Sequence, residues 1–188
     1  MNAEAASIIA RLGLAPLPGE GGFFRRTWTG PARSPGGRAS GTAIYFLLTA
    51  TDFSALHRLE TDEVWCSHAG DPIEHVQLVA GEPAPHVTVL GDVTAGHEAQ
   101  LVVPGGVWQG ARLAVGAVGG GFRPHDAIAA DLAKSAVRAP RLQPARGWAL
   151  LTCFMAPGWD GREFMLGERT ALQREFPAAT SWIAALTR

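Results

Sequence analysis

From residue 53 onward the sequence consists of short, strand-like apolar segments separated by turns at nearly regular intervals. The segments lie near 54–58, 63–68, 73–79, 85–90, 98–103, 107–115 and 147–156, and the turns carry AGDP, AGEP, LGD, AGH and PGG. Short strands at this spacing, with Gly- and Pro-rich turns, are typical of an antiparallel sandwich or barrel. The segment TAIYFLLT (42–49) is apolar on both faces, which predicts a strand inside the molecule.

Helices are expected at both ends of the chain and in one insertion. Asn2 can cap a short N-terminal helix that Gly13 would end. Apolar spacing predicts C-terminal helices over 168–176 and 181–187. Residues 117–146 open with glycines, have helical spacing in the middle and close with two prolines, so we expect a helical insertion between two barrel strands. This insertion would be either an exposed surface segment or a lid over the mouth of the barrel. We expect a single domain that spans all 188 residues.

Charge and hydropathy argue against several classes of partner. Sixteen basic and seventeen acidic residues give a net charge of −1, and there is no run of Lys or Arg, so we expect no nucleic-acid partner. The sequence has no signal peptide and no apolar run near the ~18 residues of a membrane span, so we expect a cytoplasmic protein without membrane contact. Cys66 and Cys153 form no CxxC pair and are expected to be buried free thiols.

The stretch FSALHRLETDEVWCSHAGDP carries the most informative pattern of polar residues. Alternation puts His57 and Leu59 on one face of a strand, and Glu63 and Trp65 on one face of the next. A tight hairpin through ETD would bring both faces into register inside a barrel. We therefore expect the His57 imidazole and the Glu63 carboxylate to point into one pocket, within direct or one-water hydrogen-bond reach. Gln109 should approach from the strand that follows PGG.

Two motifs and a longer series of matches resemble a known family. H-x-L-x3-E-x6-G, from His57 through Glu63 to Gly70, resembles the first cupin motif, H-x-H-x3-E-x6-G, and PGGVWQ resembles the second, P-x-G-x2-H. The chain is still more similar to a family of uncharacterised cupins, cupin family five. The matching pieces cover most of the chain outside 117–146: Gly21-Gly22-Phe23, Thr42 to Leu48, His57-Arg58-Leu59, Asp62-Glu63, Trp65, Gly70-Asp71-Pro72, Leu90-Gly91, Gly96, Gln100, Val103-Pro104, Trp108-Gln109 and Ala156 to Asp160.

This resemblance implies an all-β fold, the double-stranded β-helix or cupin jelly-roll barrel, with two antiparallel sheets and one open mouth. It also implies a homodimer, and a shape similar to deoxysugar epimerases such as dTDP-4-dehydrorhamnose 3,5-epimerase. The family's reaction is not established. The chain departs from the family's PHPEGG entry, which here is PLPGEGG with Leu17 in place of the His, and at Cys66, where the family has an aromatic residue or a His.

The four cupin metal-ligand positions do not hold a full set of ligands. They carry His57, Leu59, Glu63 and Gln109, so one ligand is replaced by an apolar side chain and another by a neutral amide. We therefore expect no metal and no other cofactor; if a metal binds, its ligands are His57, Glu63 and Gln109. The other histidines are expected at the surface or near strand ends: His68, His75, His86, His97 and His125.

Without a metal, a buried His beside a Glu is suited to general acid–base catalysis. The expected function is a small-molecule-binding cupin, an isomerase or epimerase acting on a small polar sugar, which can be nucleotide-linked. His57 would be the base and Glu63 would orient it, with Tyr45 either the opposing acid or a core side chain. Substrate contacts are expected from arginines, aromatic residues and amides: Arg25, Arg58, Trp65, Gln100, Trp108 and Gln109, with Trp159 also near the mouth. The alternatives are a metabolite-binding cupin without turnover and a metal-dependent cupin enzyme with a reduced ligand set.

Overall fold

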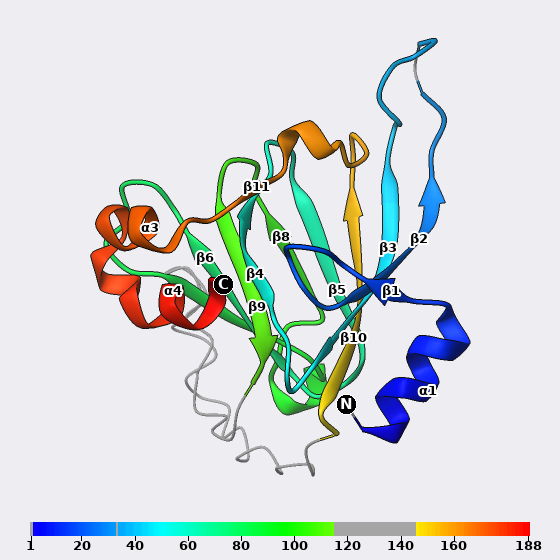
Figure 1. The fold of residues 1–188 in the computed structure, drawn as a ribbon, viewed down its shortest axis with the longest axis horizontal. Helices are drawn as coiled ribbons and strands as arrows, with labels where there is room; N and C mark the ends of the chain where they lie inside the picture. The colour runs from blue at the N-terminus through cyan, green and yellow to red at the C-terminus, as the bar shows by residue number, and fades with distance from the viewer. Residues whose placement is uncertain (1, 33, 115–145) are drawn as a thin grey trace.

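A computed structural model of the chain has two antiparallel β-sheets packed face to face, with helices at both ends (Figure 1). It describes residues 2–32, 34–114 and 146–188. The insertion expected at 117–146 therefore lies outside the described residues, apart from Arg146. In the described residues, no helix has the length and apolar character needed to cross a membrane.

The larger sheet has six strands in the order β1-β2-β3-β10-β5-β8. In that order the strands are Ala15–Pro16, Phe23–Thr29, Thr42–Thr49, Trp148–Met155, Glu63–Gly70 and Gln100–Val103. The smaller sheet has five strands in the order β11-β4-β9-β6-β7. These are Met165–Leu166, Ser54–Arg58, Trp108–Leu113, Ile73–Leu78 and His86–Leu90. All of the strand pairs between these eleven described strands are antiparallel, as the sequence pattern predicts for a jelly roll.

The helices begin and end close to the residues that the sequence indicates. Helix α1 (Ala3–Leu12) is capped by the Asn2 side chain, which accepts from the Ala5 N–H at 2.8 Å. It ends at Gly13, whose φ of 61° is the left-handed conformation that favours glycine after a helix. At the other end, α3 (Arg169–Glu175) and α4 (Thr180–Leu186) follow each other. Three short 3₁₀ turns lie among the described residues: Val93–Ala95, Gly161–Glu163 and Pro177–Ala179.

The core has two parts, one on each side of the five-stranded sheet. The inner part fills the space between the two sheets and includes Phe46, Leu48, Trp65, Ile73, Leu90 and Leu151. The outer part lies beneath the C-terminal helices and includes Leu56, Val76, Trp108, Leu172, Ile183 and Leu186. Burial of each such side chain contributes about 1.5–3 kcal/mol. The C-terminal helices thus cover the outer face of the smaller sheet and leave the interior between the sheets to the inner core.

The expected hairpin between His57 and Glu63 is wrong, because their strands belong to different sheets. β4 pairs with β9 and β11, whereas β5 pairs with β10 and β8. The chain crosses from one sheet to the other between Arg58 and Glu63, so Leu59, which is 3% exposed, lies at the crossing. His57 and Glu63 therefore face each other across the barrel interior rather than side by side on one sheet.

Candidate functional site

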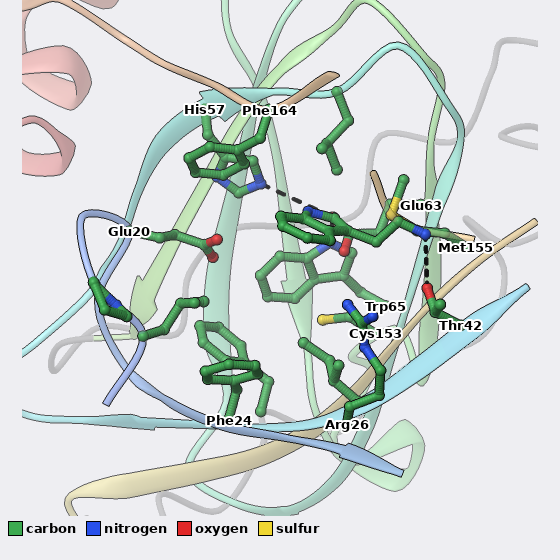
Figure 2. A pocket seen from close by; sticks show the side chains of 16 residues that line it. Glu20, Phe24, Arg26, Thr42, His57, Glu63, Trp65, Cys153, Met155 and Phe164 are labelled. Atoms are coloured by element: carbon green, nitrogen blue, oxygen red, sulfur yellow. Dashed lines mark hydrogen bonds and ion pairs between the residues drawn. The ribbon is translucent and has the colours of Figure 1, made fainter. Parts of the chain in front are cut away.

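A cavity of about 450 Å³ lies between the two sheets and reaches the surface beside the exposed residues Pro18, Arg26 and Trp159. This volume is in the usual range for small-molecule sites, about 300–1,000 Å³. Sixteen residues line it, and most of their side chains are apolar (Figure 2). The lining residues are Leu17, Pro18, Glu20, Phe24, Arg26, Thr42, Ile44, Phe46, His57, Leu59, Glu63, Trp65, Cys153, Met155, Trp159 and Phe164.

His57 lines the cavity from β4 and is 2% exposed. Its Nδ1 lies 2.8 Å from the carbonyl oxygen of Ala55. Because a carbonyl oxygen only accepts, Nδ1 carries a hydrogen and donates it. The imidazole ring stacks against Phe164, with ring centroids 5.4 Å apart. The fixed ring presents Nε2 to Glu63, whose Oε2 lies 3.9 Å away, too far for a direct hydrogen bond but within reach of one bridging water.

Glu63 enters the cavity from β5 and is held by two neighbouring donors. Its Oε2 accepts from Nε2 of Gln109 at 2.8 Å and from the indole N–H of Trp65 at 3.1 Å. The indole N–H also approaches Oε1 of Gln109 at 3.0 Å, which fixes the orientation of the amide. Behind the amide, Nε2 of His75 lies 3.2 Å from the same Oε1 and must be its donor. The Glu63 carboxylate is therefore anchored by a buried network.

The histidine behind this network corrects a sequence expectation. His75 is not at the surface but fully buried, and its ring packs edge-on against Trp65 at 4.9 Å. Burial lowers the pKa of His75 to about 3, and Nδ1 has no hydrogen-bond partner among the described residues. The imidazole is thus neutral, with its one proton on Nε2. By contrast, His68 and His86 are exposed, as expected, and His125 lies outside the described residues.

A second carboxylate, which the sequence analysis missed, reaches the same cavity. Glu20 lies in the loop between β1 and β2, and its Oε1 accepts from the Ser54 hydroxyl at 2.7 Å. Figure 2 shows its carboxylate pointing into the cavity on the side of His57. The loop can bend inward here because Gly21 has a φ of +104°, and a Cβ at this position would lie 2.4 Å from the carbonyl oxygen of Phe53. The one sequence feature that could have pointed to Glu20 is its match to the Glu of the family's PHPEGG motif.

The two carboxylates determine the protonation of His57. Burial disfavours the charged imidazole, but the negative charges of Glu20 and Glu63 outweigh burial and raise the pKa of His57 to about 9. At neutral pH the ring is therefore an imidazolium between two acids. Burial also raises the pKa of Glu20, an effect that the charge of Glu63 reinforces and that His57 and Ser54 partly offset. Such displaced values, in a cavity with access to solvent, are typical of functional sites.

The donors at this site do not fit the metal centre of a typical cupin. Leu59 occupies one ligand position, and the Gln109 oxygen is already engaged by Trp65 and His75. One imidazole with two carboxylates is left, and Glu63 Oε2 is itself occupied by hydrogen bonds. No group of three or more His, Cys, Asp or Glu side chains placed to hold a metal ion is found within the described ranges.

Several residues expected at the site lie elsewhere. Tyr45 alternates with the cavity-lining Ile44 and Phe46, so it lies on the outer face of the six-stranded sheet, where Arg25 covers its ring at 5.8 Å. Gln100 is exposed on the same outer face, opposite Cys66 in the strand register.

Arg58 and Trp108 lie on the outer face of the other sheet. The Arg58 guanidinium is 5.0 Å from the Trp108 ring, and Trp108 packs beneath the C-terminal helices. Five expected residues therefore do not line the cavity: Tyr45, Arg25, Gln100, Arg58 and Trp108. Of the other expected residues, His57, Glu63, Trp65 and Trp159 line it directly, and Gln109 contacts it through its hydrogen bond to Glu63.

Both cysteines are free, as expected. Cys153 lines the cavity and is buried, and burial raises the pKa of its thiol well above the usual value. Cys66 is only partly buried. Because Cys66 pairs with Thr152, the neighbour of Cys153, the two thiols point to opposite faces of the sheet. Cys153 is therefore a protonated, apolar part of the cavity wall.

Comparison with known proteins gives a consistent picture of the fold. The family model described as "Cupin superfamily (DUF985)" matches residues 6–167. A protein from Shewanella oneidensis has a similar structure, with 27% identity and a TM-score of 0.74, covering 100% of this chain and 98% of its own. A hypothetical protein from Leishmania major is similar, with 27% identity, a TM-score of 0.73 and coverage of 100% and 99%. A cupin-2 domain from Rhodospirillum rubrum shares the fold at 14% identity and a TM-score of 0.51, with coverage of 94% and 91%. No curated protein matches the chain.

Proposed function

The chain belongs to the DUF985 family of the cupin superfamily, and on this premise we propose that its cavity binds a small carbonyl compound and isomerises it by proton transfer. The observation that carries the proposal is the convergence of one imidazolium and two carboxylates on a largely apolar cavity. Buried charges are costly unless they are paired and hydrogen-bonded. A structural ion pair needs one carboxylate, whereas here His57 faces both Glu20 and Glu63.

The three groups divide into different chemical roles. His57 is protonated at neutral pH, so it acts as the acid rather than as the base expected from the sequence. Glu63 already accepts two hydrogen bonds on Oε2, which hold the carboxylate in place as a counter-ion for the imidazolium. Glu20 accepts one hydrogen bond, from Ser54, and its pKa is raised, which suits it to be the base.

The proposed reaction conserves atoms and charge within the site. Glu20 removes a proton from the carbon next to a substrate carbonyl, and the C–H electrons form a carbon–carbon double bond. The carbonyl oxygen takes the proton of His57 Nε2, which leaves a neutral imidazole and an enol. If Glu20 returns its proton to the same carbon and His57 takes its proton back from the enol oxygen, the substrate has only exchanged a hydrogen with solvent; release of the enol is a keto–enol tautomerisation. If the first carbon carries a hydroxyl group, the intermediate is an enediol. Glu20 then protonates the former carbonyl carbon while His57 takes the proton of that hydroxyl, and the carbonyl has moved by one carbon. An epimerase of the expected kind needs a second acid on the opposite face, and Tyr45, proposed for that role, does not line the cavity.

Solvent exchange tests the chemistry without knowledge of the natural substrate. Phenylpyruvate and fructose, each with an acidic C–H beside a carbonyl, would be incubated with the protein in D₂O, with deuterium uptake followed by NMR. We expect protein-dependent uptake from at least one compound, and a loss of about 100-fold or more in Glu20→Gln and His57→Gln. Glu82→Gln, on the exposed surface, is the matched control and should exchange like the wild type.

One observation favours a second candidate function, a metabolite-binding cupin without turnover. His57 is 2% exposed and is covered by Phe164, as expected for a group that only orders a binding site. The same NMR samples distinguish the two functions. If a compound shows saturation transfer from the protein but takes up deuterium no faster than in buffer, the cavity is a binding site and the catalytic roles are wrong.

A further inference from the structure

We infer that the ligand of this cavity is a small oxyanion with an apolar body, and that Arg26 binds its anionic group at the mouth. The inference rests on the proposed function, since it concerns the ligand of the same cavity. It differs from the sugar expected from the sequence. Two independent observations carry it: the chemistry of the cavity wall and the position of a single arginine.

The wall has too few free polar groups for a sugar. Leucine, isoleucine, phenylalanine, methionine, proline and tryptophan side chains supply most of the lining. Thr42 is polar, but its hydroxyl already accepts from the backbone N–H of Trp159 at 2.9 Å. Three other polar lining groups, Glu20, His57 and Glu63, lie together on the side of the cavity away from Arg26. A buried hydroxyl without a hydrogen bond costs about 1–3 kcal/mol, so a polyhydroxylated ligand is disfavoured along the wall.

Arg26 supplies the opposite charge at the other side of the cavity. It alternates with Phe24 on β2, and both line the cavity, whereas Arg25 between them lies on the outer face. The Arg26 guanidinium lies 5.4 Å from the ring of Trp159, another lining residue. In the part of the chain that the structure describes, no carboxylate forms an ion pair with Arg26. A guanidinium that is positioned but unpaired can bind a carboxylate or phosphate through two parallel hydrogen bonds.

The charges also set the orientation of the ligand. Figure 2 shows Arg26 on the side of the cavity opposite His57 and Glu20. The two carboxylates repel an anionic group from their side of the cavity, and the exposed Arg26 attracts it to the mouth. The apolar body then lies against Phe24 and Trp159, and the carbonyl group faces His57. A carboxylic acid or a phosphate ester whose anionic group is separated from its carbonyl group by an aromatic or branched aliphatic body satisfies this arrangement.

Binding of inert probes to the wild-type chain tests the ligand class apart from any turnover. Four probes, measured by calorimetry, separate the anionic group of the ligand from its apolar body. They are 3-phenylpropanoate, 2-phenylethyl phosphate, the neutral 3-phenylpropan-1-ol, and glucose 6-phosphate. The variant Arg26→Gln removes the charge at the mouth. Arg25→Gln is the matched control, because it removes the same charge one residue away on the outer face.

We expect one or both aromatic anions to bind about tenfold or more tightly than the alcohol, and glucose 6-phosphate to bind more weakly still. Which aromatic anion binds tighter identifies a carboxylate or a phosphate ligand. Arg26→Gln should abolish the preference over the alcohol, and Arg25→Gln should keep it. Equal binding of acid and alcohol, an unchanged preference in Arg26→Gln, tighter binding of glucose 6-phosphate, or binding of none of the probes each overturns the inference. None of these results decides the proposed proton transfer, which the exchange assay tests through Glu20 and His57.

Discussion

Loss of the His57 proton should make the folded protein less stable as the pH rises from about 6.5 to about 9. The imidazole has its usual pKa of 6.5 in the unfolded chain and a pKa of about 9 in the folded protein. A raised folded pKa means that the folded state holds the proton more tightly. Its stabilisation is therefore complete below pH 6.5 and is lost as the pH passes through 9. Since one pKa unit corresponds to 1.36 kcal/mol, the difference amounts to about 3 kcal/mol.

Urea unfolding followed by tryptophan fluorescence measures this loss. The free energy of unfolding would be determined at intervals from pH 6 to pH 9.5 for the wild type and for His57→Gln. We expect the wild type to lose about 3 kcal/mol across the window, and the variant to be less stable at pH 6.5 but nearly flat above it. His86→Gln is the matched control, because His86 is exposed and pairs with Glu82 at the surface, and it should keep the wild-type slope.

Two results would refute the reasoning. A flat wild-type curve would mean that His57 is neutral in the folded protein and that Glu20 and Glu63 do not hold its proton. A wild-type slope that persists in His57→Gln would assign the effect to another group. Because His57→Gln leaves two carboxylates without their counter-ion and can fail to fold, the imidazole of the wild type should also be titrated directly by NMR. A midpoint near 6.5 in that titration would contradict the structure.

Three further predictions concern the network and the assembly. The pKa of His75 is lowered to about 3, so the neutral imidazole stabilises the fold above pH 6.5 and this stabilisation is lost as the pH falls. Between pH 6.5 and 4, the free energy of unfolding of His75→Leu should therefore fall by about 3 kcal/mol less than that of the wild type. An equal fall in both proteins would contradict this. Trp65→Phe keeps the ring but removes the N–H shared by Glu63 and Gln109, so urea unfolding should show a loss of about 1–2 kcal/mol, and an unchanged midpoint would exclude the network. Exposed sheet edges invite pairing, so light scattering should give twice the chain mass of 19.8 kDa, and a mass of 19.8 kDa would rule out the homodimer.

The strands and helix ends could be predicted from the sequence because each depends on local chemistry. The apolar run at 42–49 forms β3, and Asn2 and Gly13 bound the first helix as their capping preferences require. The strands β1, β2 and β11 escaped prediction, since β1 and β11 have two residues each and β2 lies in a Gly- and Pro-rich surrounding. Such segments are strands only because a neighbouring strand pairs with them.

The candidate site shows where local patterns stop being informative. Alternation indicates which residues share a face of a strand, but it does not say what that face meets. It grouped His57 with Leu59 and Glu63 with Trp65, as observed, yet it could not show that the two strands belong to opposite sheets. Likewise it could not show that the C-terminal helices cover the face of β9 that carries Trp108.

Only the tertiary structure determined which charged side chains line the cavity. Glu20 lies in a loop without periodicity, and only the bend at Gly21 brings it toward His57. Arg25 and Arg26 are equivalent in the sequence, and the register of β2 against β3 determines which of them faces the cavity. By itself the sequence specified most of the strands, the helix caps, and the strand positions that turn His57 and Glu63 toward the interior. The pairing of charges across the barrel needed the sheets to close over each other, because Coulomb interactions depend on distance through space and not along the chain.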